Sequence, residues 1–286
     1  MRTADPRIVL GLHRSRHQRH LLTGALDLGI HALDTSFNYH GFTSHKTLAQ
    51  IGSDLLPHFT VSTKVGYFPG PNRAEHSLEP TRLRSALEQT NRDLGRPPDL
   101  VFLHNPEHSL RVPDHRPGDM LAQACATLAE AAANGMCKAW GIASWDPSRL
   151  PGLIDKSMPT PSVLMVRAGL LVGISTLEAA GAAADAWGLN SQARWGMSPF
   201  GGNARNPVWG RTDPRLFLKP ADSEPSTAQA AFRTAYSLPR VSTIAVGSDD
   251  PAHLSELLDA LDLPLNAHAV DAYRKLLRDR QPSQLA

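Results

Sequence analysis

The sequence predicts a (β/α)8 barrel, a closed ring of eight parallel strands with helices outside it, for three reasons. Eight short apolar runs recur along the 286 residues, and an amphipathic segment follows each of them. The runs are almost continuously apolar, as parallel strands covered on both faces are. No Gly-x-Gly-x-x-Gly turn follows the first run, which favours a closed barrel over an open doubly wound sheet.

The expected elements follow one another in order along the chain. The strands are expected at residues 8–13, 30–34, 59–64, 100–104, 139–144, 163–167, 193–198 and 241–247. The helices are expected at residues 18–28, 44–56, 80–94, 119–134, 147–154, 176–187 and 226–237, with two more at 251–261 and 267–278. Pro80 stands at a first helical turn and Gly95 and Gly135 at helix ends, where these residue types are favoured.

Three long, turn-rich segments follow strands, near residues 66–79, 105–118 and 200–225. Segments that follow strands lie on the C-terminal face of a barrel, where barrel enzymes place their active sites. Loops of this length in a compact domain are commonly functional. No repeat or linker divides the chain, so we expect one domain over residues 1–286 with its site on that face.

Composition narrows the class of protein. Hydrophobic residues make up 41% of the chain, and the formal net charge of +2 gives no reason to expect a nucleic acid or a membrane as partner. Cys125 and Cys137 have neither disulfide nor metal-ligand spacing, so no metal is expected. Because no apolar leader or membrane-length run occurs, we expect a cytoplasmic protein. A small-molecule substrate is expected, and a monomer or small homo-oligomer.

Four side chains with acid–base chemistry are expected to meet on the C-terminal face. Asp34, Lys64 and His104 close the second, third and fourth expected strands, and Tyr39 comes five residues after Asp34. Ionisable groups at these strand ends are typical of catalytic residues. An ammonium at Lys64, held by Asp34, is expected to lower the pKa of the Tyr39 phenol from its usual value of about 10. Tyr39 could then exchange a proton near neutral pH while a neutral His104 orients a carbonyl oxygen.

These residues lie in motifs that resemble those of the aldo-keto reductases. Residues 29–41 (Gly-Ile-His-Ala-Leu-Asp-Thr-Ser-Phe-Asn-Tyr-His-Gly) resemble the family motif around its catalytic Asp and Tyr. Residues 62–66 (Ser-Thr-Lys-Val-Gly) resemble its Lys motif, and residues 103–106 (Leu-His-Asn-Pro) its His motif. The resemblance is collinear and covers nearly the whole chain, with later cofactor-side signatures at residues 139–145, 198–202 and 245–248.

The resemblance implies an oxidoreductase in which NADPH or NADH delivers a hydride to the carbonyl of a small organic substrate. Tyr39 would donate the proton, with Lys64 and Asp34 tuning it. His104 would orient the substrate. The positions that fall on the cofactor side are Ser144, Met165, Ser198, Pro199, Phe200, Gly201, Gly247, Ser248, Asp249 and His253.

Several cofactor positions depart from the family pattern. Ser144 stands where the family has Asn and Met165 where it has Gln, and both usual residues help to hold the nicotinamide carboxamide. Asp249 and Asp250 lie where a 2′-phosphate is usually bound; they would repel it, or accept hydrogen bonds from a ribose 2′-hydroxyl as NAD sites do. A third possibility is that no cofactor binds and the four residues catalyse a lyase, isomerase or cyclase reaction. A binding or regulatory barrel is the last alternative.

Aromatic and amide side chains on the same face are expected to line an apolar substrate slot or to pack the loops onto the barrel. They are Phe37, Tyr67, Phe68, Asn105 and Trp145. Basic residues between positions 14 and 19 follow the first strand and border the mouth of the barrel. They form a solvated helix start, or they favour an anionic substrate or a phosphate.

Overall fold

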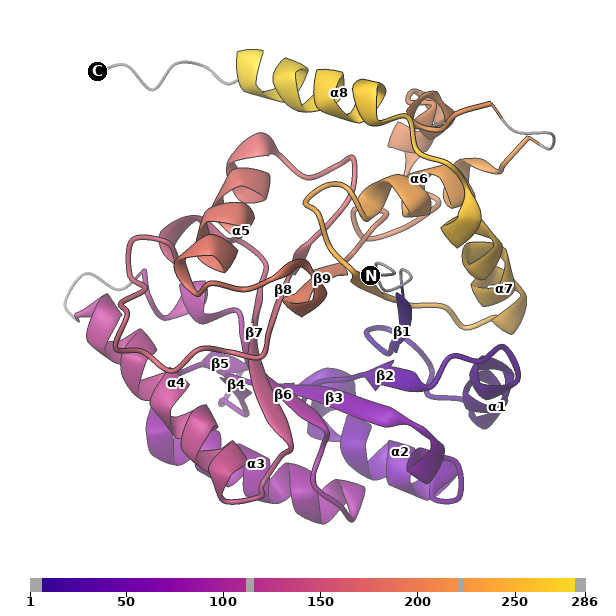
Figure 1. The fold of residues 1–286 in the computed structure, drawn as a ribbon. Helices are drawn as coiled ribbons and strands as arrows, with labels where there is room; N and C mark the ends of the chain where they lie inside the picture. The colour runs from indigo at the N-terminus through magenta and orange to yellow at the C-terminus, as the bar shows by residue number, and fades with distance from the viewer. Residues whose placement is uncertain (1–6, 112–115, 221–223, 281–286) are drawn as a thin grey trace.

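The computed structural model describes residues 7–111, 116–220 and 224–280, and its centre is a closed barrel of eight parallel strands (Figure 1). The strands are β1 (Arg7–Gly11), β2 (Ala32–Asp34), β3 (Thr60–Val65), β6 (Leu100–His104), β7 (Ala139–Ser144), β8 (Val163–Arg167), β9 (Arg194–Met197) and β10 (Thr243–Val246). They pair in the order β1-β10-β9-β8-β7-β6-β3-β2, and β1 closes the ring by pairing with both β10 and β2. The predicted (β/α)8 barrel is confirmed.

Helices surround the barrel, as the ring of coiled ribbons in Figure 1 shows. They are α1 (Arg19–Asp27), α2 (Ser44–Gly52), α3 (Pro80–Leu94), α4 (Pro117–Ala133), α5 (Ile174–Ala186), α6 (Thr227–Ala235), α7 (Pro251–Asp259) and α8 (Ala267–Asp279). The helix predicted at residues 147–154 is wrong, because only the 3-10 turn η4 (Pro147–Arg149) forms between β7 and β8. Pro151 has no N–H to donate to the Pro147 carbonyl, and Gly152 follows it, so a second turn is not supported.

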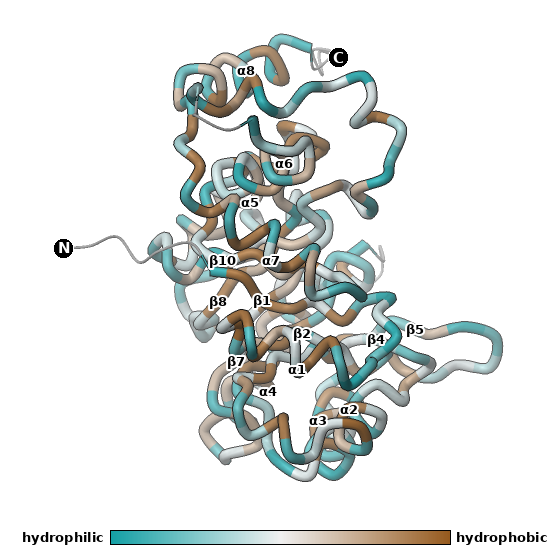
Figure 2. Tube along the Cα trace, turned by 90° about the vertical axis from the view of Figure 1, so that its right-hand side faces the viewer, coloured by the Kyte–Doolittle hydropathy of each residue, from teal (hydrophilic) through white to brown (hydrophobic). Residues whose placement is uncertain are grey.

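The first of the predicted long loops contains two short strands. The loop near residues 66–79 folds into an antiparallel hairpin of β4 (Tyr67–Phe68) and β5 (Glu75–His76). Figure 2 shows this hairpin projecting at the right, away from the body of the molecule. Parts of the other two loops, residues 112–115 and 221–223, lie outside the described residues, as do residues 1–6 and 281–286 of the predicted domain.

The last helix, α8, crosses the outside of the barrel at the top of Figure 1. Its Tyr273 and Leu277 belong to a small apolar cluster with Leu170 and Phe217. The Tyr273 hydroxyl donates to the Leu170 carbonyl (2.6 Å). Phe217 ends the 3-10 turn η7 (Pro214–Phe217) in the loop after β9. Helix α8 therefore holds this loop against the barrel.

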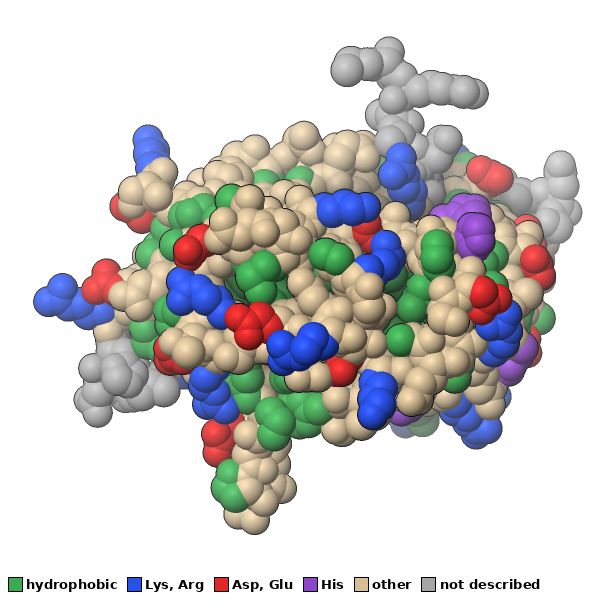
Figure 3. All heavy atoms as spheres, turned by 90° about the horizontal axis from the view of Figure 1, so that it is seen from below, with side chains coloured by type: hydrophobic (Ala, Val, Ile, Leu, Met, Phe, Trp, Pro, Cys, Tyr) green, Lys and Arg blue, Asp and Glu red, His purple; other side chains and the backbone are tan. Residues whose placement is uncertain are grey.

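Charges of both signs are mixed on the outer surface. Figure 3 shows Lys and Arg side chains interspersed with Asp and Glu on the face that lies at the bottom of Figure 1. One exposed pair, Arg84 with Glu130 (2.9 Å), joins α3 to α4. Such pairs contribute little to stability. None of the helices in the described ranges is long and apolar enough to cross a bilayer.

The barrel interior is filled by side chains that include Val9, Phe102 and Met165. Phe102 is fully buried, and its ring centroid lies 5.8 Å from that of Trp195. Gly141 of β7 makes room for this packing. A Cβ at Gly141 would lie 2.9 Å from the Phe102 ring and 2.5 Å from a backbone carbonyl oxygen of β8. Only glycine fits here without moving the β7–β8 ladder.

We predict that Gly141→Ala lowers the free energy of unfolding by about 1–3 kcal/mol, because the new methyl group would overlap backbone that is fixed in the sheet. Gly181, inside α5, is the matched control because no atom lies within 4 Å of an added Cβ. Gly181→Ala should raise the free energy of unfolding by about 0.5–1 kcal/mol. Urea unfolding measures both changes, and equal stability of the two variants would contradict this account of the packing.

Candidate active site

A buried ion pair between neighbouring strands forms the base of the site. Asp34 ends β2, and Lys64 lies one residue before the end of β3. The Lys64 Nζ contacts Asp34 Oδ2 and donates to the Thr35 carbonyl (2.8 Å), while Asp34 Oδ1 accepts from Ser62 Oγ (2.9 Å). The Lys64 and Asp34 side chains are only 3% and 6% exposed. Burial alone would lower the pKa of Lys64, but Asp34 and Tyr39 raise it above its ordinary value, so Lys64 is an ammonium.

Tyr39 stands directly beside this pair. It begins the 3-10 turn η1 (Tyr39–Phe42), whose next residues His40 and Phe42 have positive φ angles of 50° and 70°. Non-glycine residues in this region are strained and cluster at functional sites. The Lys64 Nζ lies 5.3 Å from the centroid of the Tyr39 ring. The turn thus directs the phenol toward the ammonium.

The pKa of Tyr39 differs from the prediction. Burial raises the pKa of the phenol by more than Lys64 lowers it, so the net direction is upward. The expected lowering is therefore wrong for the ligand-free site. Its ring is enclosed by His13, with ring centroids 5.1 Å apart, and by His104, with centroids 6.4 Å apart. Tyr39 keeps its proton at neutral pH and can act as an acid.

His104 closes the site from the end of β6. Its Nδ1 lies 3.1 Å from Ser36 Oγ, and its carbonyl accepts from His76 Nε2 of the hairpin (2.7 Å). Burial, and then the charge of Lys64, hold the pKa of His104 well below its ordinary value. The imidazole is neutral at neutral pH, as expected. The structure therefore brings the four predicted acid–base residues to one place at the mouth of the barrel.

The predicted substrate-side residues divide into two groups. Tyr67 lies with its ring 4.9 Å from that of His104, and its hydroxyl lies 3.4 Å from Asn105 Nδ2. The Trp145 N–H donates to Asn105 Oδ1 (3.1 Å), and the Trp145 side chain is largely open to solvent. Tyr67, Asn105 and Trp145 therefore border the mouth.

Phe37 and Phe68 lie deeper. Their ring centroids are 6.4 Å apart, and both pack against the apolar cluster under α3 and α4. Phe68 is buried and carries the Arg82 guanidinium 4.4 Å from its ring centroid. These two rings pack the hairpin and the loop after β2 onto the barrel.

The predicted residues on the nicotinamide side offer little polar surface. Ser144 is buried, and its hydroxyl donates to Glu107 Oε2 (2.9 Å). Met165 has no exposed surface and packs inside the barrel with Phe102 and Ala143. Neither side chain reaches the open mouth.

The loop after β9 is better placed to meet a ligand. Ser198 and Gly201 have positive φ angles of 57° and 66°, and the Gly201 N–H donates to the Ser198 carbonyl (3.0 Å). Pro199 is buried, and Phe200 stacks on Phe232 of α6 with centroids 6.3 Å apart. A cavity of about 270 Å³ lies between this loop, α6 with its cap Ser226, and Glu256 of α7.

The start of α7 holds the remaining predicted residues. Asp250 caps the helix by accepting from the Ala252 N–H (2.9 Å), and Ser248 Oγ donates to the Asp250 carbonyl (2.9 Å). Asp249 Oδ1 accepts from the Arg16 N–H (3.1 Å), which ties this turn to the loop after β1. Gly247, Asp249 and His253 are exposed. Both carboxylates already have backbone donors.

Two acidic residues near the site, Glu107 and Glu256, were not among the residues predicted from the sequence. Glu107 is only 1% exposed, and its carboxylate accepts from Ser144 Oγ and from the N–H groups of Trp145 and Asp146. Glu256 of α7 lines the 270 Å³ cavity and accepts a hydrogen bond from Ser226 Oγ. The only signal for Glu107 was its position soon after the end of β6, and Glu256, inside α7, gave none. Within the described parts of the chain, no group of three or more His, Cys, Asp or Glu could hold a metal ion.

Residues 13–177 match the model of the family described as "Aldo/keto reductase family". The chain belongs to the aldo/keto reductase family. The family likeness predicted from the sequence motifs is thereby confirmed, and with it membership of a family of oxidoreductases. No curated protein sequence matches the chain.

Solved structures of aldo-keto reductases share its fold. One is an aldo-keto reductase from Bacillus halodurans in its holo form, with a TM-score of 0.71 and 16% identity over 98% of this chain and 95% of that chain. Another, from Klebsiella pneumoniae in complex with NADPH, has a TM-score of 0.68 and 15% identity over 98% and 93%. A third, from Brucella melitensis, has a TM-score of 0.65 and 18% identity over 94% of each chain. At these identities the likeness establishes the fold.

We predict that acid weakens the fold through buried neutral histidines. His45 is buried with its Nε2 2.7 Å from Thr63 Oγ1, and burial lowers its pKa to about 4. The same side chain has a pKa of about 6.5 in an unfolded chain. Between these values the unfolded chain binds a proton that the folded protein does not. The free energy of unfolding should fall as the pH falls through this window, by up to about 3 kcal/mol from His45.

Urea unfolding at a series of pH values measures this effect. His45→Gln should flatten the decline between about pH 6.5 and 4. His31→Gln is the control, because His31 is exposed and the substitution should leave the decline as it is. An unchanged decline in His45→Gln would show that other groups cause it.

Proposed function

We propose that this protein is a nicotinamide-dependent reductase of a small carbonyl compound, with Tyr39 as the proton donor. The observation that supports this most is the phenol of Tyr39 beside the buried Lys64–Asp34 pair, with the neutral imidazole of His104 across from it. A positioned acid and a hydrogen-bond donor at one point are what protonation of a developing alkoxide requires.

In the proposed reaction, a carbonyl oxygen lies between Tyr39 and His104. The neutral His104 imidazole, whose Nδ1 lies 3.1 Å from Ser36 Oγ, would donate a hydrogen bond to that oxygen in the tautomer that carries its proton on Nε2. A bound reduced nicotinamide would supply the hydride. Tyr39 gives its proton to the oxygen, and the ammonium of Lys64 stabilises the resulting phenolate. Asp34 keeps Lys64 charged and in place.

The residues of the chain fit the adenosine half of such a cofactor. The cavity of about 270 Å³ includes Phe200 and Trp209 from the loop after β9 and Glu256 from α7. Apolar walls with a few polar groups are typical of cofactor sites. Trp209 Nε1 is buried and has no hydrogen-bond partner among the described residues, so a ligand could accept from it. The Ser198–Gly201 turn and the exposed Asp249 would border the rest of the molecule.

A second candidate function is acid–base catalysis without a cofactor, as in a lyase, isomerase or cyclase. One observation favours it: Ser144 is engaged with Glu107 and Met165 is buried, so neither gives a nicotinamide carboxamide a polar partner. Tyr39 and His104 could move protons on a bound substrate without hydride transfer. Binding of NADPH or NADH separates the two functions, because the second requires neither.

We predict that Tyr39→Phe lowers kcat for any reducible aldehyde at least about 100-fold, since the acid is lost. The melting temperature should stay within a few degrees of the wild type, because the ring remains. Tyr67→Phe, the matched control at the neighbouring phenol, should alter KM more than kcat. Full activity in Tyr39→Phe, or its loss only in Tyr67→Phe, would assign the proton to another group.

We predict that NADH binds at least as tightly as NADPH, because the carboxylates of Asp249 and Asp250 oppose a 2′-phosphate. Asp249→Ser should raise NADPH affinity several-fold and leave NADH affinity nearly unchanged. Asp259→Ser, at the far end of α7, is a control for the loss of one charge. Titration followed by cofactor fluorescence measures both affinities for the wild type and for each of the two variants. No binding of either cofactor up to millimolar concentration would rule out the reductase and favour the second candidate function.

A further inference from the structure

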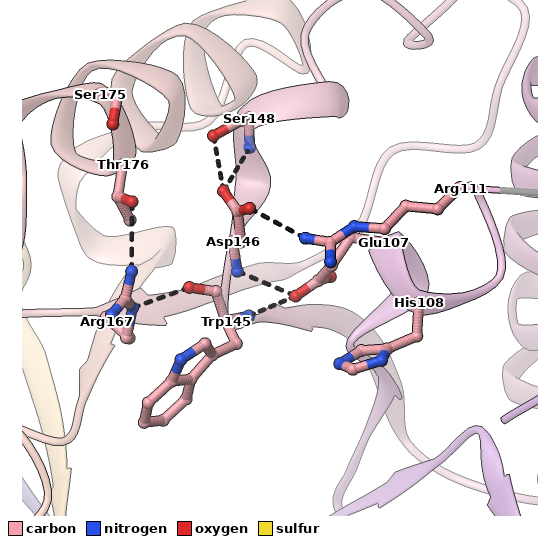
Figure 4. A pocket seen from close by; sticks show the side chains of 9 residues that line it. All are labelled: Glu107, His108, Arg111, Trp145, Asp146, Ser148, Arg167, Ser175 and Thr176. Atoms are coloured by element: carbon pink, nitrogen blue, oxygen red, sulfur yellow. Dashed lines mark hydrogen bonds and ion pairs between the residues drawn. The ribbon is translucent and has the colours of Figure 1, made fainter. Parts of the chain in front are cut away.

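The C-terminal face has a cavity that the proposed proton transfer does not use. Its volume is about 380 Å³, and it lies over the ends of β6, β7 and β8 (Figure 4). Arg111 comes from the loop after β6 and Asp146 from the loop after β7, while Arg167 is the last residue of β8. Its lining is therefore mainly polar, with four charged side chains among nine residues, unlike an apolar substrate slot.

Three of the four formal charges in this cavity are already satisfied. Arg111 Nη2 lies 3.1 Å from Asp146 Oδ2, so these two charges offset each other. Glu107 lies buried beneath them, and its oxygens accept from Ser144 Oγ (2.9 Å) and from the N–H groups of Trp145 and Asp146 (2.8 Å each). Neither carboxylate is left to attract a cationic ligand.

Arg167 differs from Arg111, the other cation of the cavity, because the groups to which it donates are neutral. Its Nε donates to the Trp145 carbonyl (2.8 Å) and its Nη2 to Thr176 Oγ1 (3.2 Å). Arginine has further N–H donors in the same plane. The guanidinium also lies 5.1 Å from the centroid of the Trp145 ring, which fixes its orientation. Figure 4 shows Arg167 held in this way at the side of the cavity opposite Arg111. A preorganised cation with donors to spare suits an anion.

We propose that this cavity binds a carboxylate of the substrate through Arg167, so that the protein reduces carbonyl compounds that also carry a carboxylate group. This inference rests on the proposed reductase function. The planar guanidinium matches a carboxylate in geometry. With Glu107 and Asp146 close by, a monoanion is favoured over a dianionic phosphate. Trp145 is 44% exposed and offers its ring to the apolar body of the substrate.

The cavity adjoins the imidazole that would orient the carbonyl. The ring of Tyr67 lies 4.9 Å from that of His104 and 5.8 Å from that of His108, which lines the cavity. Asn105 follows His104 in the chain and accepts a hydrogen bond from the Trp145 N–H (3.1 Å). These contacts make the cavity a neighbour of the site at which the carbonyl would be reduced.

Isothermal titration of the full chain with benzoate, benzamide and inorganic phosphate tests the site without any cofactor. Benzoate should bind at least about tenfold more tightly than benzamide, and Arg167→Gln should weaken benzoate at least about tenfold without affecting benzamide. Asp146→Asn should tighten benzoate binding, because it removes an opposing charge and releases Arg111. A higher affinity of Asp146→Asn for benzoate cannot result from misfolding, which would only weaken binding. Arg92→Gln, an exposed substitution on α3, should change nothing.

The inference is overturned if Arg167→Gln binds benzoate as tightly as the wild type does, or if phosphate binds more tightly than benzoate. In the kinetic arm, kcat/KM for 4-carboxybenzaldehyde should exceed that for benzaldehyde about tenfold, and Arg167→Gln should abolish the preference. If neither aldehyde is reduced but benzoate binding depends on Arg167, the carboxylate site stands and the proposed reductase reaction fails. Equal kcat/KM values for both aldehydes in the wild type would overturn the substrate class.

Discussion

The Asp34–Lys64 ion pair, buried where β2 and β3 end, is the interaction on which the site depends. Removing each ion from water costs several kcal/mol, and only complete partnering offsets that cost. The chain supplies it: Asp34 accepts from Ser62 and Lys64 donates to the Thr35 carbonyl. All of these groups are fixed by the parallel register of β2 and β3. A barrel in which this register slipped by one residue would leave a charge buried and unpaired.

Burial, with a smaller contribution from the Lys64 ammonium, sets the protonation of the groups around the ion pair. Burial is the larger cause of the low pKa of His45 and His104, and the charge of Lys64 adds to it in both. The same holds for His13, whose pKa is lowered by burial, then by Arg14 and Lys64. For Tyr39 the two causes oppose each other, and burial prevails. The Lys64 ammonium is therefore surrounded by neutral imidazoles and a neutral phenol. These side chains can donate protons or hydrogen bonds without carrying a charge themselves.

Much of this could be predicted from the sequence, because it depends on the strands. Buried parallel strands require continuous apolar runs, and the polar residue that ends a run must lie at the mouth, so Asp34, Lys64 and His104 were found together. The direction of the pKa shift of Tyr39 could not be predicted in this way, because it depends on how closely His13 and His104 enclose the ring. Glu107 was not found because a carboxylate after a proline in a loop looks solvated. Its burial follows from N–H groups supplied by a different loop.

Helix α8 and the barrel strands differ in the free energy needed to open them. The strands are held by a continuous parallel ladder and a full core, whereas α8 is held by the small cluster around Leu170 and Phe217 and by a few polar contacts, among them Arg278 with Glu178. Segments with few buried contacts open at a lower free energy than the global unfolding transition. The loop that α8 holds is the one that begins at the wall of the 270 Å³ cavity. Local opening of α8 would therefore release the loop beside this cavity while the strands that hold the ion pair stay paired.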